Sequence, residues 1–419
     1  MSGTVEPRES GATVQGLLVD SSDQRLLRDS VAQIASKYGA EYFLERSRAG
    51  AKLDELWADL GSAGMLGVHL PVEYGGGGGG LTELSIVVEE LAAHGIPLLL
   101  TVISPAICGS ILAAHGSPEL KAEWLPGLAD GIRKMAFALT EPDSGSNSHA
   151  VRTFARADGP GWIVSGGKCF ISAADEADAL LVVARAIDVP DERRNPLSLF
   201  VVPADAKGVT LQPLPTAVVS PDRQFTVFLD EVGLPPEALI GLPGKGLPQV
   251  FAGLNPERIL ASAISCGIGR YAVAKAVDYA KERRVWSVPI GAHQGISHPL
   301  AECHIEVEMA RLATRAAAQQ FDSGHDAAAA ANMAKFAAAE ASLRALDQAI
   351  QVHGGNGLTP EYGLAEMWFT ARLMRTAPVS REMVLNYIGE HTLGLPSSYR
   401  MPQRPPADHA DPLPEPQIR

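Results

Sequence analysis

The sequence is poor in cysteine and in long hydrophobic runs, and both shortages exclude classes of protein. It contains four cysteines and no Cys-x-x-Cys pair, which argues against a disulfide framework and against a zinc site. No stretch of about 18 apolar residues occurs, so no membrane-spanning helix is expected. The first 16 residues lack the basic start and the apolar core of a secretory signal. We therefore expect a cytoplasmic protein with no metal site and no membrane span.

Basic residues are too few for a nucleic-acid-binding surface. The chain has 35 lysines and arginines against 48 acidic residues, a formal net charge of −13. This excess of acid provides neither the electrostatic footprint of a nucleic-acid-binding protein nor a basic membrane-facing surface. The composition, 46% hydrophobic and 20% charged, is that of a globular protein, and 419 residues suffice for one large or two to three smaller domains.

Hydrophobic periodicity divides the chain into three parts. Apolar residues recur at helical steps from about residue 23 through the first third, and again from 247 to 395. Between residues 134 and 241 the period shifts toward two, with strand-like runs at 152–157, 162–165, 168–172, 180–185, 198–202 and 224–229. We predict an α+β multidomain fold with a loose tail (1–20), a helical domain (21–133), a β domain (134–243), a second helical domain (244–396) and a proline-rich tail (397–419). Residues 188–195 are predicted to be a charged loop.

Six consecutive glycines occupy residues 75–80. A phosphate-binding P-loop needs a following Gly-Lys-Ser/Thr, whose lysine and hydroxyl hold the phosphates and the metal, and none follows here. We therefore predict a flexible turn before the next helix.

Three widely separated motifs contain the residues suited to chemistry. The first, LTEPDSGSN at residues 139–147, follows a short apolar run and is rich in hydroxyl and amide groups around a proline and a glycine. A strand that opens into such a turn is suited to holding a polar ligand by backbone and side chain. The second, GGKCFISA at 166–173, indicates a turn and then a strand, and the third, QVHGGNG at 351–357, interrupts a long helical region.

In this order the three motifs resemble those of the acyl-CoA dehydrogenase family of flavoproteins, and the resemblance runs from about residue 23 to 395. It implies a helical N-terminal domain, a middle β-barrel or sandwich and a C-terminal four-helix bundle. It also implies FAD-dependent α,β-dehydrogenation of an acyl-CoA in fatty acid metabolism. That reaction needs a carboxylate base at the α-carbon, donors to the thioester oxygen and a flavin held against the substrate. Electrons would pass to an electron-transfer flavoprotein or a similar acceptor.

The resemblance assigns flavin contacts to the first two motifs. Phe137, Leu139 and Thr140 would border the isoalloxazine ring. Phe170 takes the place of the usual tryptophan or tyrosine beside the ring, and Ser146 would hold the pyrophosphate or the CoA arm. A further contact is Ser172, in place of the usual threonine at flavin N5. Without the flanking motifs, Phe137 and Phe170 would be interpreted as core aromatic residues.

A second group of cofactor contacts is expected near the end of the chain's helical part. Arg283, with Gln294 further along, would pair with the flavin pyrophosphate of a neighbouring subunit, because a planar guanidinium suits phosphate. Gln351, Gly354 and Gly355 would meet the adenosine end, where glycine allows close backbone approach. The alternative for Arg283 is a helix C-terminal charge facing the helix dipole. Sharing of the flavin between subunits implies a homo-oligomer, a dimer or tetramer, or else a hetero-oligomer.

The usual catalytic glutamate of the family is missing. Pro378 stands at its position and has neither a carboxylate nor a backbone N–H. Shifting the alignment by one residue would place Ala377 at the position of the glutamate. The resemblance places Ser380 at a position that contacts the cofactor. Glu382 is acidic but is not expected to reach the substrate.

A minority of the family, resembling isovaleryl-CoA dehydrogenase, places the base on a bundle helix in a Leu-Asp-x-Glu-Arg segment. This chain has LNPER at residues 254–258, and Glu257 precedes Arg283 by 26 residues, as in that subgroup. We therefore expect Glu257 to be the base and Arg258 to orient it or to bind the CoA arm. The alternative is structural, since Asn255 can cap a helix, Pro256 suits its first position and an acid is favoured in the first turn.

Three functions remain open from the sequence. The first is an FAD-dependent acyl-CoA dehydrogenase that uses Glu257. The second is a catalytically weak partner subunit of a heteromeric dehydrogenase, because Pro378 removes two catalytic groups. The third is a flavin monooxygenase of the same fold, which needs no base for an α-proton.

Overall fold

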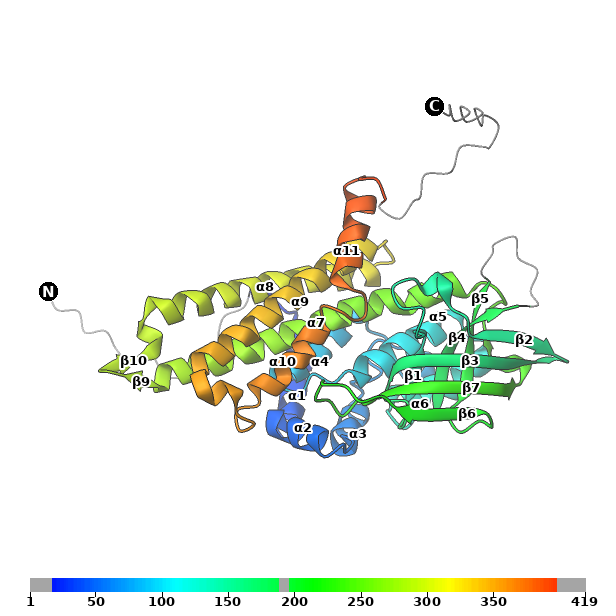
Figure 1. The fold of residues 1–419 in the computed structure, drawn as a ribbon, viewed down its shortest axis with the longest axis horizontal. Coiled ribbons are helices and arrows are strands. Elements are labelled where there is room, and N and C mark those ends of the chain that lie inside the picture. The colour runs from blue at the N-terminus through cyan, green and yellow to red at the C-terminus, as the bar shows by residue number, and fades with distance from the viewer. Residues whose placement is uncertain (1–16, 188–195, 398–419) are drawn as a thin grey trace, which may run out of the picture.

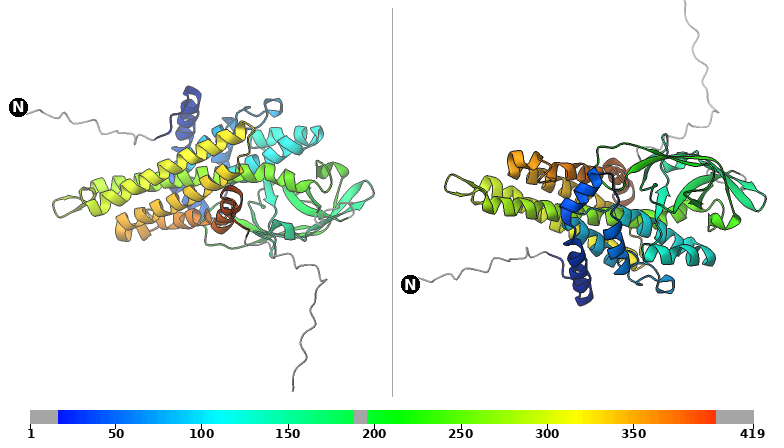
Figure 2. Two further views of the ribbon diagram at one scale, coloured as in Figure 1. Left: turned by 90° about the horizontal axis from the view of Figure 1, so that it is seen from above. Right: turned by 90° about the horizontal axis from the view of Figure 1, so that it is seen from below.

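The computed structural model describes residues 17–187 and 196–397, and the charged loop predicted at 188–195 lies outside them. Along the longest axis a sheet domain occupies one end and a helical bundle extends to the other, with the N-terminal helices packed beside both (Figure 1). Views from above and below show the bundle helices running lengthwise away from the sheet (Figure 2). The order of a helical, a sheet and a helical part confirms the predicted fold class.

The N-terminal part is helical. Its first helix begins with a capping box, in which the Ser21 hydroxyl accepts from the Gln24 N–H and the Gln24 side chain accepts from the Ser21 N–H. The elements are α1 (Ser22–Ala35), α2 (Gly39–Arg48), α3 (Asp54–Ser62), η1 (Val72–Tyr74), α4 (Leu81–Ala93), the π-helical η2 (Val102–Gly109), α5 (Ser110–His115) and α6 (Pro118–Ala129).

The glycine run is an ordered turn rather than a flexible one. The N–H groups of Gly77, Gly78 and Gly79 donate to carbonyls of residues 67, 70 and 68, each at 2.9 Å. A Cβ on Gly76 would lie 2.2 Å from the Leu70 carbonyl oxygen, so this segment needs glycine for close backbone packing. The predicted turn is therefore present, but its predicted flexibility is wrong.

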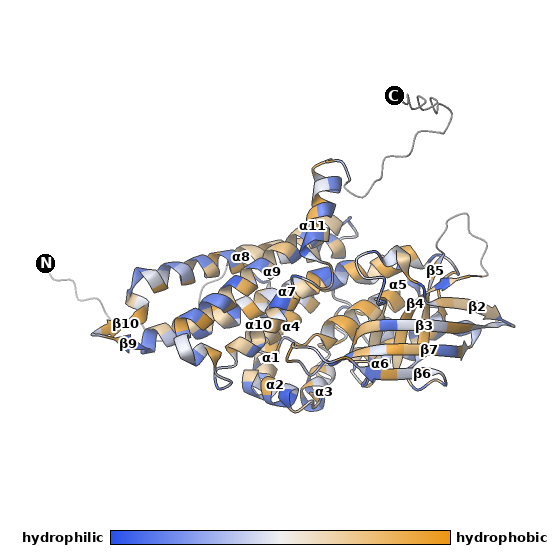
Figure 3. Cartoon of the chain, in the orientation of Figure 1, coloured by the Kyte–Doolittle hydropathy of each residue, from blue (hydrophilic) through white to orange (hydrophobic). Residues whose placement is uncertain are grey.

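The middle part is one mixed eight-stranded sheet in the order β6-β7-β3-β2-β4-β5-β8, with β1 also paired to β4. Alternate residues of its strands fill a core of its own that includes Val164, Val182 and Phe200. Hydrophobic segments lie along these strands and the helices beside them (Figure 3). The elements are β1 (Met135–Ala138), η3 (Ser148–Ala150), β2 (Phe154–Asp158), β3 (Gly161–Ser172), β4 (Ala179–Ala186), β5 (Leu197–Pro203), β6 (Val209–Pro213), β7 (Gln224–Leu234), η4 (Pro236–Ala238) and β8 (Leu239–Ile240).

The C-terminal part is an alanine-rich bundle whose longest helix, α7, runs for 37 residues. Small residues allow close packing: a Cβ on Gly253 of α7 would lie 2.8 Å from Ile111 Cδ1 and 2.9 Å from Ile107 Cγ2. The elements are α7 (Gly246–Glu282), β9 (Arg284–Val285), β10 (Val288–Pro289), η5 (Ile290–Ala292), α8 (Gln294–Asp322), α9 (Ala328–His353), η6 (Gly354–Leu358), α10 (Leu364–Leu373), α11 (Arg381–Tyr387) and η7 (Ile388–Thr392).

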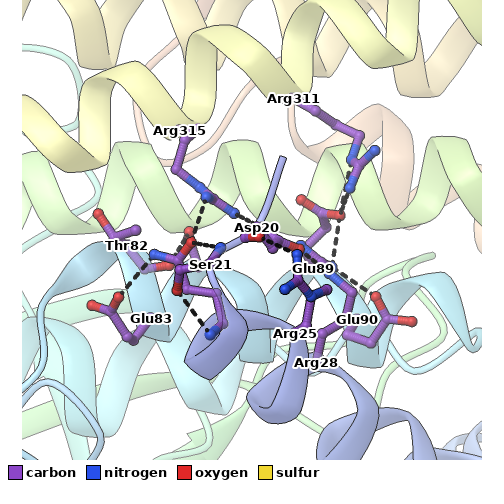
Figure 4. Close-up of polar contacts among 12 residues, drawn as sticks. Asp20, Ser21, Arg25, Arg28, Thr82, Glu83, Glu89, Glu90, Arg311 and Arg315 are labelled. Carbon is purple, nitrogen blue, oxygen red and sulfur yellow. Dashed lines mark hydrogen bonds and ion pairs between the residues drawn. The ribbon is translucent and has the colours of Figure 1, made fainter. Parts of the chain in front are cut away.

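A buried charge cluster joins the N-terminal segment to the bundle (Figure 4). Glu89 of α4 pairs with Arg28 of α1, Arg270 of α7 and Arg311 of α8, at 3.2, 2.8 and 2.9 Å. Asp20 pairs with Arg28 and with Arg315 of α8, and the Leu17 N–H donates to Glu308. The prediction of a loose tail is therefore wrong for residues 17–20, while 1–16 lie outside the described residues.

Two further predictions about elements were incomplete. The runs at 162–165 and 168–172 are one strand, β3, whose register shifts at Gly166, where φ is +150°. Strand β6 was not predicted. Across residues 17–187 and 196–397, every helix is too short or too polar to cross a membrane.

Candidate functional site

The loop after β1 lies at the boundary between the sheet domain and the helices. Alternation along the strand turns Ala136 and Ala138 into the sheet core, whereas Phe137 and Leu139 pack against the helical core. The Thr140 carbonyl accepts from the Cys169 N–H at 2.9 Å, which ties this loop to β3. Within the described part of the chain, neither the N–H nor the hydroxyl of Thr140 donates a hydrogen bond.

Phe170 stands next to this loop in an unusual conformation. Its φ is +56°, a left-handed value that is rare for a residue with a side chain, and the residue is 61% exposed. Ser172 lies two residues on, and its hydroxyl accepts from the Gln224 Nε2 amide at 2.8 Å. The structure thus brings together five of the predicted flavin contacts, namely Phe137, Leu139, Thr140, Phe170 and Ser172.

These residues fit a flavin ring. Such a ring has two apolar faces and an edge of hydrogen-bonding groups. Phe170 offers an exposed aromatic surface, and Thr140 has an N–H and a hydroxyl with no protein partner among the described residues. A large aromatic side chain held exposed beside unpaired donors is explained by a bound planar ligand.

Two further predicted contacts, Ser146 and Ser380, have different surroundings. Ser146 is exposed in the loop after β1, where Ser144 turns inward to donate to the Asn147 carbonyl at 2.8 Å. Ser380 is the N-cap of α11, and its hydroxyl accepts from the Met383 N–H at 3.3 Å. Its hydroxyl therefore already has a structural role.

The second predicted group of cofactor contacts lies far from the first. Arg283 ends α7 and Gln294 begins α8, at the end of the bundle opposite the sheet domain (Figure 1). Gln351, Gly354 and Gly355 lie at the end of α9 on the same side, where His353 stacks on Tyr279 with 4.2 Å between ring centroids. One chain therefore does not bring both groups to a single flavin.

Glu257 lies inside helix α7, not at its start. The helix begins at Gly246 and continues through Pro256, so the alternative that Asn255 caps it and Glu257 occupies its first turn is wrong. Glu257 is half-buried one turn after Gly253, and its charge acts on the Cys108 thiol of η2. Among the described residues its carboxylate makes no hydrogen bond or ion pair.

The surroundings of Glu257 suit a base. Burial raises the pKa of its carboxyl to about 7, against the opposing charges of Arg258 and Lys335. A proton acceptor works best when its pKa lies near the working pH. Arg258 is held along its own helix, since its Nη1 donates to Asn255 Oδ1 at 3.0 Å.

The segment that contains Pro378 is fastened to helix α9. The buried Lys335 Nζ donates to the Val379 carbonyl, and Glu340 accepts from Arg375 at 2.9 Å and from Arg381 at 3.0 Å. The positive charge of Lys335 also opposes the rise in the pKa of Glu257 that burial causes.

Comparison with known proteins identifies the family. The models of the acyl-CoA dehydrogenase N-terminal, middle and C-terminal domains match residues 21–132, 136–232 and 244–393. Over 383 residues the chain is 56% identical to acyl-CoA dehydrogenase FadE12 of Mycobacterium tuberculosis, covering 91% of this chain and 98% of that relative. The chain belongs to the acyl-CoA dehydrogenase family. It is therefore an oxidoreductase that acts on acyl-CoA with FAD.

Solved structures of acyl-CoA dehydrogenases have the same fold. Butyryl-CoA dehydrogenase from Megasphaera elsdenii has a TM-score of 0.85 at 26% identity, covering 90% of this chain and 99% of that one. A glutaryl-CoA dehydrogenase complex with glutaryl-CoA has a TM-score of 0.86 at 28% identity, covering 91% and 98%.

Sequence reasoning assigned no role to three residues of the candidate site. Gln224 holds Ser172, Lys168 ties β3 to the loop after β1, and Lys335 ties α9 to the segment after Pro378. The one available signal for Lys335 was a lone lysine in a run of alanines, which is out of place on a buried helix face.

Proposed function

We propose that this protein catalyses α,β-dehydrogenation of an acyl-CoA thioester with Glu257 as the base that takes the α-proton. The observation that supports it is an unpaired carboxylate inside α7, with its pKa raised to about 7 by burial, in a chain that has Pro378 where the family has glutamate. Glu257 is half-buried, and a carboxylate that is partly removed from water and serves only structure is normally paired or hydrogen-bonded.

The chain's own residues divide the work in this proposal. Phe170 and Leu139 cover the ring, and the unpaired N–H and hydroxyl of Thr140 bind its polar edge. Bound FAD supplies the acceptor for the hydride that leaves the β-carbon. The Glu257 carboxylate takes the proton from the α-carbon.

The test is anaerobic stopped-flow bleaching of the flavin by butyryl-, octanoyl-, palmitoyl- and isovaleryl-CoA. Glu257→Gln keeps the shape of the side chain and should retain FAD while reduction slows by about 10²–10⁴-fold. Glu382→Gln is the matched control, because the Glu382 carboxylate is exposed on α11, just after the segment that contains Pro378. Bleaching by Glu257→Gln at the rate of the unaltered protein would contradict the proposal.

The partner-subunit function is the second candidate, and the loss of two catalytic groups at Pro378 favours it. In that case no acyl-CoA bleaches the unaltered protein until a second subunit is added. The flavin monooxygenase is distinguished by a different result. Reduced flavin supplied by a reductase should then be oxidised rapidly by oxygen.

We also propose a homo-oligomer, most simply a dimer or tetramer, in the cytoplasm, which passes electrons to an electron-transfer flavoprotein or a similar acceptor. Two surfaces of the chain support assembly. Trp286 is 94% exposed between β9 and β10, beside Arg283. Ile305, Met309 and Leu312 form an exposed apolar stripe at helical spacing on α8.

A further inference from the structure

Gln224, the first residue of β7, lies opposite Ser172, the last residue of β3, where the two strands pair. Ile171 belongs to the core of the sheet domain, so alternation along β3 turns Ser172 to the opposite face of the sheet. On that face Phe137 and Leu139 pack against the helical core. The Ser172 hydroxyl therefore belongs to the same boundary between domains as the loop after β1.

The side-chain amide of Gln224 has a fixed orientation. Its Nε2 donates to the Ser172 hydroxyl at 2.8 Å and to the Asp222 carbonyl at 3.3 Å. A flipped amide would place its oxygen against the Asp222 carbonyl oxygen, where two acceptors repel each other. Asp222 is held in turn, because its Oδ2 accepts the Leu99 N–H at 2.9 Å. The amide therefore presents a donor to Ser172, and the Ser172 oxygen is the acceptor in this bond.

The hydrogen of the Ser172 hydroxyl is the group left for a ligand. Within residues 17–187 and 196–397, its one acceptor is Gln224 Oε1 at 3.2 Å, a longer contact than the 2.8 Å bond that the hydroxyl accepts. A hydroxyl can exchange such a long contact for an acceptor on a bound molecule and keep the shorter bond. The ring nitrogens and carbonyl oxygens along the polar edge of a flavin are acceptors of this kind.

We propose that Gln224 is a positioning residue for the cofactor: its amide holds the Ser172 oxygen and leaves the hydroxyl hydrogen for an acceptor on the edge of the flavin ring. The inference rests on the proposed function, which places the ring beside Thr140 and Phe170. Without the amide the hydroxyl rotates freely and loses its direction. Because Gln224 acts through Ser172, removing either side chain should cost the same hydrogen bond to the ring.

The affinity for FAD tests this role in four proteins: the unaltered chain, Ser172→Ala, Gln224→Met and the double variant. The dissociation constant is measured by serial dilution of the holoprotein, with the fluorescence of released FAD as the signal. Ser172→Ala should raise the dissociation constant by about 10-fold, the size of effect expected for one lost hydrogen bond. Gln224→Met should raise it by a similar factor, and the double variant should bind FAD no more weakly than either single variant.

Gln212→Met, at an exposed position of the neighbouring strand β6, is the matched control and should leave the dissociation constant unchanged. If Gln224→Met does not fold, Gln224→Leu takes its place in the same set of four proteins. A purely structural role of Gln224 would weaken FAD binding in the Ser172→Ala background as well. Such additive losses, or an unchanged dissociation constant in Ser172→Ala, would overturn the inference. Failure of the proposed function looks different, because Glu257→Gln would then bleach normally.

Discussion

Lys168 Nζ lies 2.8 Å from Glu141 Oε1, and the two side chains are 0% and 5% exposed. The same ammonium donates to the Leu139 carbonyl at 3.1 Å. The Glu141 carboxylate also accepts the N–H groups of Arg152 and Thr153, at 2.6 and 2.9 Å. One buried ion pair thus fixes the loop that presents the candidate flavin contacts, and every polar group of the pair is used.

Breaking this pair should destabilise the protein and release FAD. Lys168→Met leaves Glu141 buried without its cation, and such a loss costs about 3–5 kcal/mol. We expect a lower melting temperature and a lower FAD content after gel filtration. Lys207→Met, an exposed lysine of the same domain, is the control and should change neither. The double variant with Glu141→Gln should recover part of the loss, and an unchanged melting temperature in Lys168→Met would refute the assignment.

The sequence predicted what is encoded locally. Strand β4 has the apolar residues of a buried strand, and α9 has a helical run of alanines, so the order of helical and sheet parts followed from periodicity alone. The two motifs around Thr140 and Phe170 were recognised by their resemblance to those of a known family, and the structure joins them through the hydrogen bond from the Cys169 N–H to the Thr140 carbonyl.

Properties that depend on distant contacts were not predictable. Pro256 allowed the alternative of a helix that starts there, but α7 begins at Gly246 and passes through it, with its earlier turns packed against η2 and β5. Asp20 appeared to belong to a polar tail, and only folding places Arg315, 295 residues away, beside it. The hydrogen bond from Lys335 to the Val379 carbonyl, 44 residues away, likewise depends on folding.

The buried cluster of Figure 4 predicts a large loss of stability on removal of one acid. Burial alone would raise the pKa of Glu89, but Arg311, Arg270 and Arg28 lower it to about 2. Glu89→Gln would leave three arginines without their shared partner and should cost about 3–5 kcal/mol, read as a lower melting temperature. Glu302→Gln removes an exposed acid that pairs with Arg344, and it should cost less than about 1 kcal/mol. Similar losses in both variants would contradict a special role for the cluster.

The carboxyl of Asp222 should make the protein less stable as the pH rises, whereas Glu89, whose pKa is lowered, should make it less stable as the pH falls. It is buried between the sheet domain and the helices, where its Oδ2 accepts the Leu99 N–H at 2.9 Å. Burial, and then the charge of Glu176, raise the pKa of its carboxyl to about 7 from 3.8. Because the pKa of Asp222 is higher in the folded protein than in the unfolded chain, the protonated carboxyl stabilises the fold. This contribution is fully present below the unfolded pKa of 3.8 and is lost as the pH rises through the folded pKa of about 7.

Melting temperatures of Asp222→Asn between pH 4 and 8 check this sign. The amide retains an acceptor for the Leu99 N–H and does not titrate. The stability of the variant relative to the unaltered protein should therefore increase as the pH rises, by about a few kcal/mol. Asp205→Asn, at an exposed position of the same domain, should follow the unaltered protein at every pH. A constant difference between Asp222→Asn and the unaltered protein would show that Asp222 does not titrate in this range.

Sharing of the flavin between subunits predicts complementation between two defective chains. Arg283 follows α7 at the end of the bundle farthest from the sheet domain, whereas Phe170 lies on β3 beside the loop after β1, so we expect a single flavin to meet both only if they belong to different chains (Figure 1). Arg283→Glu and Phe170→Glu are both changes at exposed positions, which favours normal folding. Each variant alone should lose FAD, whereas Arg284→Glu, the neighbouring exposed arginine, should retain it.

In a mixed dimer isolated through two different affinity tags, the chain with Arg283→Glu has an intact Phe170 and receives an intact Arg283 from its partner. That site should bind FAD, and the other site carries both defects, so about half of the sites should be filled. The measurement is the ratio of flavin to protein absorbance in the purified hybrid. If Arg283 instead serves the flavin of its own chain, both sites of the hybrid are defective and the protein should stay colourless. Light scattering on the same sample must show at least two chains, because a monomer at micromolar concentration leaves no partner to supply Arg283.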